Sequence, residues 1–426
     1  MGQFMKLTGL IALISTLTNY VCAQSKCPNT GDEQFVLRLG DGYRYSKLEL
    51  ALWAPHHMVV DTEGNLLVVE GGSVSVRRLV LEELGDIVCV QSSSDLISED
   101  ASNTGIALSA DGKTLFTSTE ESVWAYDYDA ATGQVGQRRE IVTNMRVGLQ
   151  HIYRPLLTSK YNPDTILVAR GALGDIDPDT TDPAVARSVI KAFSISEGLQ
   201  KTHDYARDGE VLAWGIREVV AMAEHPVFGG IWAVESQMDD VHLNGRDIHN
   251  DNPAERLTYH GVLNDTENPY KGLNYGYPSC APAWDTESIG IDGLQVGDLF
   301  KPDGVPDIPD GECANRMKGR LHFDAHTAPR DIKFNVNGTA AYIAFHGSWN
   351  RDSLIGFRVM RVDFGPDGQP VHPANSKTAQ VPVFENVEMA HCPLNCFQPS
   401  GLAIDKKGRI FLSNDQLGYV YVIYEA

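Results

Sequence analysis

The stretch PRDIKFNVNGTAAYIAF, residues 329–345, decides how this chain folds. It holds a short apolar run, a turn that carries Asn and Gly, and a second apolar run. Two β-prone runs on either side of such a turn are typical of a β-hairpin. One hairpin says little about a chain of 426 residues, but this pattern recurs along the whole length.

Five further segments repeat the strand, turn and strand: PHHMVVDTEGNLLVVE (55–70), NTGIALSADGKTLFTS (103–118), YRPLLTSKYNPDTILVAR (153–170), REVVAMAEHPVFGGIWAVE (217–235) and QPSGLAIDKKGRIFLSN (398–414). Hairpins at such a period are typical of a β-propeller, in which each copy supplies two strands of a four-stranded blade. Residues 122–129, 186–195 and 356–364 supply outer strands. We therefore predict an all-β, six-bladed β-propeller. Two β-sandwiches would predict a linker in the middle of the chain, and the sequence shows none.

Residues 1–23 have the pattern of a secretory signal peptide. Lys6 precedes an apolar core and the small-residue site Val21-Cys22-Ala23. This segment is too short for a membrane anchor, and no other stretch approaches the ~20 apolar residues that span a bilayer. We expect a secreted protein, residues 24–426, that forms one propeller domain with a Gly/Pro-rich insertion at about 264–320 and does not bind membranes.

The exported chain keeps an even number of cysteines, which predicts disulfides in a secreted protein. They are Cys27, Cys89, Cys280, Cys313, Cys392 and Cys396. A zinc site is disfavoured because no CxxC pair occurs. Cys392 and Cys396 are near neighbours and are expected to pair. We favour Cys280–Cys313 and Cys27–Cys89, although the sequence leaves the connectivity open.

The charge of the chain restricts its partners. Acidic residues outnumber basic ones by 56 to 35, and the formal net charge is −21. Such a chain repels phosphate backbones, so nucleic-acid binding is disfavoured. Two N-glycosylation sequons, at Asn264 and Asn337, fit a secreted glycoprotein.

The hairpin pattern also predicts which side chains meet. In a hairpin, the start of the first strand and the end of the second lie at the same edge, and a radial arrangement brings these edges to one mouth of the central channel. The residues at these positions are His56, His57, Glu70, Asn103, Ser118, His151, Arg154, Arg170, Arg217, Glu218, Ser236, Gln237, His326, Arg330, His346, Trp349, Asn350, Arg351, Gln398, Asn414 and Asp415. Arginines and histidines gathered in an acidic protein predict a site for an anionic ligand.

The chemistry of this mouth is limited by what the sequence lacks. It contains no GxSxG, HExxH or GK[ST] motif, and no GxGxxG that opens a helix. A histidine base, arginines that grip anions and a tryptophan that stacks remain. No side chain among them can accept a hydride, so redox chemistry at this mouth would need a bound cofactor.

Four motifs resemble one family: HGSWNR (346–351) followed by GFRV, GLNYGYPSC (272–280), NTGIALSADGKTLF (103–116) and HPVFGGIWAVESQMDD (225–240). The chain resembles, from about residue 45 to its end, the fungal secreted pyranose dehydrogenases of auxiliary activity family 12. These enzymes depend on pyrroloquinoline quinone (PQQ), and they are relatives of the bacterial sorbosone dehydrogenases and soluble quinoprotein glucose dehydrogenase. The resemblance implies a six-bladed propeller, a calcium ion that bridges protein and PQQ, and oxidation of a pyranose at the anomeric hydroxyl.

The same resemblance assigns roles to single residues. His151 is implied to be the general base, and Arg217 to face the oxygens of the quinone. The residues implied to bind the cofactor are His57, Asn103, Arg154, His346, Trp349, Asn350 and Arg351. The turn Ser236, Gln237, Met238 and Asp239 is where backbone carbonyls are expected to bind calcium. Thr104, Glu218 and Gln398 depart from the family pattern, and the acidic Glu218 could alter substrate choice or redox potential.

Two other functions remain open from the sequence. A calcium-dependent lactonase would hold its metal with Glu70, Glu218, Asn103 and Asp415, but it leaves the arginines and Trp349 unexplained. A non-catalytic propeller that binds glycans or proteins is the third, since fold does not determine function. Under the dehydrogenase hypothesis the partners are a sugar substrate and an external electron acceptor, such as a cytochrome domain or a copper polysaccharide oxygenase, and the protein is expected to be a monomer.

Overall fold

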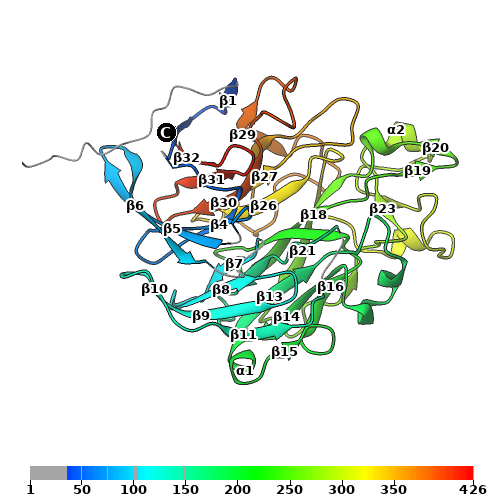
Figure 1. Ribbon diagram of the computed structural model, residues 1–426. Helices are drawn as coiled ribbons and strands as arrows, with labels where there is room; N and C mark the ends of the chain where they lie inside the picture. Colours follow the sequence, from blue (N-terminus) through cyan, green and yellow to red (C-terminus); the bar gives the residue numbers. More distant parts are fainter. Residues whose placement is uncertain (1–35, 49, 74, 99–103, 147–149, 426) are drawn as a thin grey trace, which may run out of the picture.

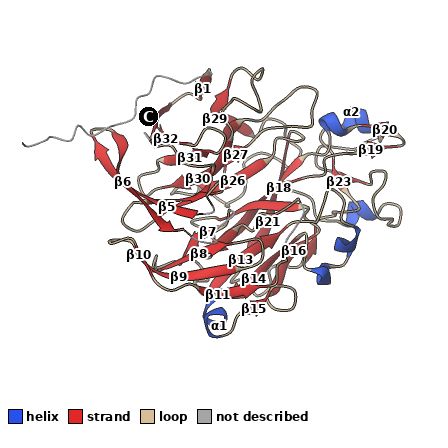
Figure 2. Ribbon diagram, in the orientation of Figure 1, coloured by secondary structure: helices blue, strands red, loops and turns tan. Residues whose placement is uncertain are grey.

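A computed structural model describes residues 36–48, 50–73, 75–98, 104–146 and 150–425. Strands dominate it, and the helices are short (Figure 2). Six sheets are arranged in a ring (Figure 1), which confirms the predicted six-bladed β-propeller. No helix in the described part of the chain is both long and apolar enough to cross a membrane.

The blades are numbered in chain order. Blade 1 contains β3 (Pro55–Val60), β4 (Leu66–Glu70), β5 (Ser75–Leu84) and β6 (Ile87–Ile97); blade 2 contains β7 (Ile106–Leu108), β8 (Thr114–Ser118), β9 (Val123–Asp129), β10 (Gln134–Val135), β11 (Arg139–Thr143) and β15 (His203–Asp204). Blade 3 contains β12 (Leu156–Thr158), β13 (Thr165–Arg170), β14 (Val189–Ser194), β16 (Glu210–Trp214) and β22 (Leu273–Asn274). Blade 4 contains β17 (Glu218–Glu224), β18 (Gly230–Ser236), β21 (Glu255–Val262) and β25 (Leu321–Phe323); blade 5 contains β26 (Pro329–Phe334), β27 (Ala340–Phe345), β28 (Arg358–Asp363), β29 (Gln380–Asn386) and β1 (Leu37–Leu39). Blade 6 contains β30 (Pro399–Ile404), β31 (Ile410–Asn414), β32 (Tyr419–Glu425) and β2 (Tyr43–Lys47).

All six predicted hairpins form, each as the first two strands of one blade. In blade 5, for example, Pro329 pairs with Phe345 at one end of the hairpin and Phe334 with Ala341 at the other. The predicted outer strands are β9, β14 and β28, each the third strand of its blade.

Alternation along the strands explains why the blades pack as a ring. Successive side chains of a strand point to opposite faces, so Leu66 and Val68 of β4 pack against blade 6 whereas Leu67 and Val69 pack against blade 2. An apolar cluster of this kind lies between every pair of neighbouring blades. The hydrophobic core is therefore divided into six wedges around the central channel.

Strands from both ends of the described chain close the ring. β2 pairs with β32 as the outermost strand of blade 6, and Tyr43 lies opposite Glu425. β1 continues this segment onto blade 5, where Leu37 pairs with Asn386 (Figure 1). The predicted signal peptide, and the start of the domain at residue 24, lie outside the described residues.

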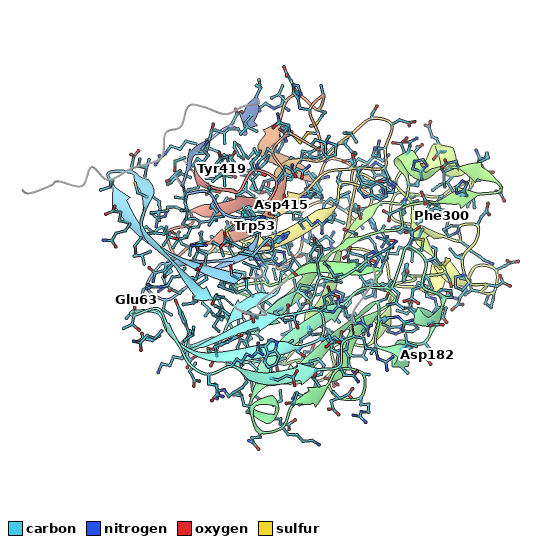
Figure 3. The ribbon with its side chains drawn as sticks, viewed as in Figure 1. Trp53, Glu63, Asp182, Phe300, Asp415 and Tyr419 are labelled. Atoms are coloured by element: carbon cyan, nitrogen blue, oxygen red, sulfur yellow. A yellow bond between two sulfur atoms is a disulfide. The ribbon has the colours of Figure 1, made fainter. Side chains whose placement is uncertain are left out.

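The predicted insertion lies inside blade 4, between β21 and β25. Its elements, with those of the preceding loop, are β19 (His242–Leu243), β20 (Arg246–Asp247), η3 (His249–Asp251), β23 (Ala281–Pro282), α2 (Thr286–Ile289), β24 (Leu299–Phe300) and η4 (Glu312–Asn315). The same segment also contains β22, which pairs with β16 of blade 3. Phe300, labelled in Figure 3, packs with Met238 in one apolar cluster, which joins the insertion to the turn after β18. The remaining helices are η1 (Pro178–Thr181), η2 (Pro183–Val185) and α1 (Ile195–Gln200).

Two of the three predicted disulfides are present. Cys280 is bonded to Cys313 within the insertion, and Cys392 is bonded to Cys396. The third, Cys27–Cys89, cannot be placed because Cys27 lies outside the described residues.

Candidate active site

A cavity of about 590 Å³ opens at the mouth where the first strands of the blades begin and the second strands end. Eleven of the residues that the hairpin pattern placed at this mouth line the cavity: His151, Arg217, Glu218, Ser236, Gln237, His326, Arg330, His346, Trp349, Asn350 and Gln398. The residues at this mouth therefore surround a cavity. Its chemistry depends on the individual side chains.

His151 is fixed in one orientation. Its Nδ1 atom lies 2.9 Å from the carbonyl oxygen of Ala172, which can only accept, so Nδ1 carries the proton. Its Nε2 atom is then free to act as a base, and it lies 3.9 Å from a carboxylate oxygen of Glu218. Gly171 allows this approach, because a Cβ atom there would lie 2.9 Å from the Cβ of His151.

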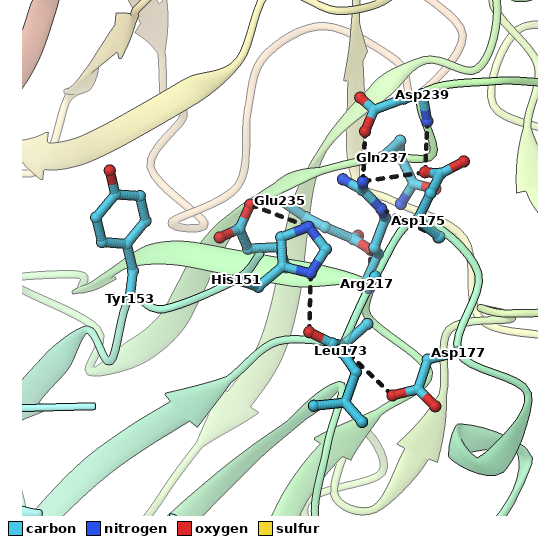
Figure 4. A network of polar contacts seen from close by, with 12 residues as sticks. His151, Tyr153, Leu173, Asp175, Asp177, Arg217, Glu235, Gln237 and Asp239 are labelled. Atoms are coloured by element: carbon cyan, nitrogen blue, oxygen red, sulfur yellow. Dashed lines mark hydrogen bonds and ion pairs between the residues drawn. The ribbon is translucent and has the colours of Figure 1, made fainter. Parts of the chain in front are cut away.

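Arg217 is held between two carboxylates. One of its Nη atoms donates to Asp239 at 2.7 Å and lies 3.0 Å from Asp175 (Figure 4). Burial by itself would lower the pKa of the guanidinium, but the two aspartates outweigh burial and raise this pKa. The backbone N–H of Arg217 also donates to Glu235 at 2.7 Å. Arg217 is thus a permanently charged, rigid group at the cavity wall.

The turn after β18 presents polar groups to the cavity. Ser236, Gln237 and Asp239 line it, whereas Met238 is buried in the apolar cluster of the insertion. The side-chain amide of Gln237 is buried, and neither its oxygen nor its nitrogen has a hydrogen-bond partner among the described residues. The backbone N–H of Gln237 donates to Glu255 at 2.8 Å. Burial raises the pKa of Glu255 to about 8.

The HGSWNR loop forms the opposite wall. Nε2 of His346 lies 3.0 Å from Asp415, and although burial would raise the pKa of Asp415, the histidine outweighs burial and lowers it. Asn350 donates from Nδ2 to the carbonyl of Asp239 at 3.1 Å, and its Oδ1 is buried without a partner among the described residues. Trp349 lines the cavity with 69% of its surface exposed.

Three residues that the family resemblance assigned to the cofactor lie elsewhere. Arg351 is not among the residues that line the cavity, and it pairs with Asp251 at 2.7 Å. Arg154 is fully buried and donates to backbone carbonyls, including that of His151 at 2.9 Å. Nε2 of His57 forms a hydrogen bond of 2.9 Å with the carbonyl oxygen of Arg330. The residue lines a separate cavity at the other end of the channel.

Of the residues at which the chain departs from the family pattern, Glu218 and Gln398 line the cavity, and Thr104 is buried. Asn103 lies outside the described residues.

Tyr153, Asp175 and Glu255 belong to the site and were not predicted. Tyr153 lines the cavity, and the guanidinium of Arg330 lies 5.0 Å from the centre of its ring. Its position two residues after His151 in the sequence was a signal that could have found it. Asp175 and Glu255 reach the site from a loop and from the start of β21, and the hairpin pattern carries no information about either.

The cavity fits the cofactor and metal implied by the sequence motifs. Buried polar atoms without a partner among the described residues line it at Gln237, Asn350 and Nε of Arg330. Buried polar groups are normally satisfied, so such a set indicates a bound polar ligand. Arg217, Arg330 and His346 can face the carboxylates of PQQ, and the oxygen atoms of residues 236–239 suit calcium.

Comparisons with known proteins agree with this geometry. A PQQ-dependent sugar dehydrogenase of Hypocrea jecorina is 40% identical over 91% of this chain and 89% of its own length. A PQQ-dependent pyranose dehydrogenase of Coprinopsis cinerea is 33% identical over 93% of this chain, which spans 56% of that longer relative. A calcium structure of Trichoderma reesei family AA12 superimposes with a TM-score of 0.88 at 39% identity, covering 93% of this chain and 99% of that one. A family model described as TrAA12-like matches residues 37–426, and the chain belongs to this family.

Proposed function

We propose that this protein is a secreted sugar dehydrogenase that oxidises a pyranose at its anomeric hydroxyl with PQQ and calcium. The observation that carries the proposal is the pairing of a histidine base, free at Nε2, with a cavity of cationic and unsatisfied polar groups. When bound, PQQ supplies the hydride acceptor that no side chain provides.

Several side chains and the turn after β18 would hold the cofactor and its metal. Arg217 is pre-positioned by Asp175 and Asp239, so that it does not have to reorganise when negative charge develops beside it. Arg330 is a further cation at the wall, and His346 lines it as well. The free amide of Gln237 and the carbonyls of its turn would complete the oxygen ligands of calcium.

His151 would move the proton. The bond from Nδ1 to the Ala172 carbonyl leaves the lone pair of Nε2 to accept the hydroxyl proton of the sugar. The charged imidazolium that results lies beside the carboxylate of Glu218, which stabilises it electrostatically. Departure of the hydride from the anomeric carbon then leaves a lactone.

The arrangement of the site offers little support for the lactonase alternative. Glu70, which it would need as a ligand, accepts from the backbone of Trp53 at 2.7 Å and pairs with Arg77 at 2.8 Å. The carboxylate of Asp415 already pairs with His346. Only Glu218 of the three acids lines the cavity.

The test is a titration of metal-stripped protein with PQQ, with and without calcium, followed by addition of single pyranoses. We expect calcium-dependent binding, seen in the absorbance of the quinone, and reduction of a dye with one or a few sugars. No quinone binding under either condition would overturn the proposal. Hydrolysis of a lactone in the absence of quinone would favour the lactonase instead.

Export and electron transfer complete the proposal. The signal-peptide pattern at residues 1–23 and the two disulfides support a secreted enzyme. Electrons would pass from the mouth of the cavity to an external acceptor, such as a cytochrome domain or a copper polysaccharide oxygenase. Secretion is checked by recovery of the mature chain from the medium with Gln24 as its first residue.

A further inference from the structure

The end of the propeller opposite the candidate active site carries an exposed apolar strip. It lies on the turns between the first two strands of blades 3, 4 and 5, and consists of Tyr161, Val227, Phe228 and Val336. The exposed fractions of these side chains are 41, 51, 44 and 52%. Contiguous apolar surface on a secreted protein usually marks a place where something binds. We call these four residues the far-face strip.

Contacts between the turns hold the members of the strip next to one another. The hydroxyl of Tyr161 donates to the carbonyl of Pro226 at 2.8 Å, which ties blade 3 to blade 4. The ring centre of His225 lies 5.1 Å from that of Phe228. Nε2 of His225 forms a hydrogen bond of 2.9 Å with the carbonyl oxygen of Gly338, which ties blade 4 to blade 5. The turns that carry the four apolar side chains are therefore joined across three blades.

A glycosylation sequon lies at each end of the far-face strip. Asn337 directly follows Val336 and is exposed. Asn264 is exposed just beyond Val262, which pairs with Gly230 at the far end of blade 4. The Nδ2 atom of Asn264 donates to the backbone carbonyl of Tyr161 at 2.6 Å. These are the two sequons in the sequence, so neither lies at the mouth of the candidate active site.

We propose that N-linked glycans on Asn264 and Asn337 cover the far-face strip. In the modification, Nδ2 bonds to the anomeric carbon of a diphosphate-linked oligosaccharide, the lipid diphosphate leaves with the electrons of the broken C–O bond, and the amide loses one proton. The modified amide keeps one N–H, so the bond to Tyr161 can persist. The C–H faces of the first sugar residues would then pack on the Tyr161 and Phe228 rings and shield them from water.

The geometry favours glycans over a protein partner on this surface. A partner would have to approach between two branched sugars, one at each end of the strip, and such sugars are bulky and solubilising. The arrangement also leaves the opposite mouth clear for the sugar substrate and the electron acceptor. The proposal rests on secretion, but it does not depend on dehydrogenase activity.

The experiment uses the full chain secreted from a yeast host. Peptide mapping after treatment with peptide-N-glycosidase, which converts each modified asparagine to aspartate, gives the occupancy of Asn264 and Asn337. Hydroxyl-radical footprinting then compares the glycosylated and the deglycosylated protein. We expect both sites to be occupied, and oxidation of Tyr161 and Phe228 to rise several-fold on deglycosylation. Trp349, exposed at the opposite mouth, is the internal control and should not change.

Single variants assign each glycan to its part of the strip. N264Q should raise oxidation of Tyr161, and N337Q should raise that of Phe228, whereas T266S keeps the sequon and should match the wild type. Absence of glycan from both asparagines would overturn the proposal. Full occupancy with unchanged oxidation of both rings would overturn it as well. Dye reduction is not measured in this experiment, so its results are separate from the test of the proposed function. If a variant fails to fold, enzymatic deglycosylation of the wild-type protein still gives the comparison.

Discussion

The carboxylate of Glu218 lies 3.9 Å from Nε2 of His151, and both side chains are buried at the wall of the same cavity. This separation is too long for a direct hydrogen bond, and it places a negative charge beside the nitrogen that would become positive during proton transfer. Glu218 is one of the positions at which the chain departs from the family pattern. Its location places it beside the proposed base.

Replacing Glu218 by glutamine should lower kcat by about 10- to 100-fold, because the charged imidazole loses its electrostatic partner. The affinity for PQQ should change little, since the amide has nearly the same shape. Steady-state dye reduction and a quinone titration measure the two quantities separately. Equal losses in both would show that Glu218 binds the cofactor instead.

Replacing His151 by alanine should lower kcat by about 10²- to 10⁴-fold, the usual contribution of a general base. The variant should still bind PQQ, because the cationic groups at the cavity wall remain. Activity close to that of the wild type would remove His151 from the proposed mechanism.

Gly171→Ala tests how closely His151 must be positioned. The new Cβ atom would lie 2.9 Å from the Cβ of His151 and should push the imidazole away. We expect this displacement to lower kcat by about tenfold or more. Gly174→Ala, three residues along the same loop, is the matched control, because its Cβ would approach nothing closer than 3.5 Å. If both variants lose activity equally, the loop and not the histidine contact is responsible.

Arginines inside and outside the cavity should behave differently. Arg217→Lys keeps the charge but loses the planar fork between Asp175 and Asp239, so we expect PQQ to bind about 10- to 100-fold more weakly. Arg351→Lys should leave quinone affinity within about twofold, because Arg351 pairs with Asp251 away from the cavity. Isothermal titration of both variants, checked for folding by circular dichroism, decides whether the structure or the family resemblance places Arg351 correctly.

Acid should destabilise the fold through a buried histidine far from the cavity. Burial lowers the pKa of His260 to about 3, from an ordinary value of 6.5. Between these values the unfolded chain binds the proton and the folded chain does not, so stability falls as the pH drops below about 6.5, by up to about 1.4 kcal/mol per pH unit.

His260→Asn should therefore lose less stability than the wild type between pH 7 and pH 5, whatever its stability at pH 7. Urea unfolding at the two pH values gives the comparison. The same decline in both proteins would show that other groups dominate the acid response.

The sequence predicted the parts of this structure that depend on local pattern. Period-two alternation and turn residues define each hairpin, and the hairpins determine which residues reach the mouth, as His151, Arg217 and His346 do. It could not predict where long side chains point. The hairpin pattern assigned Arg154 and Arg351 to the mouth, yet the side chain of Arg154 donates to buried carbonyls and that of Arg351 pairs with an aspartate 100 residues away. Asp175 and Glu255 depend on loop paths that no local pattern encodes.

The pairing of β2 with β32 has a consequence for biosynthesis. Blade 6 is complete only when Tyr43–Lys47 is hydrogen-bonded to Tyr419–Glu425, so a strand that is made early in translation must wait for one made much later. Until that later strand has left the ribosome, the strand partner of the early segment does not exist, and the unpaired edge is open to wrong pairing. A nascent chain that stalls before residue 419 should therefore be a substrate for molecular chaperones, however well its first blades have formed.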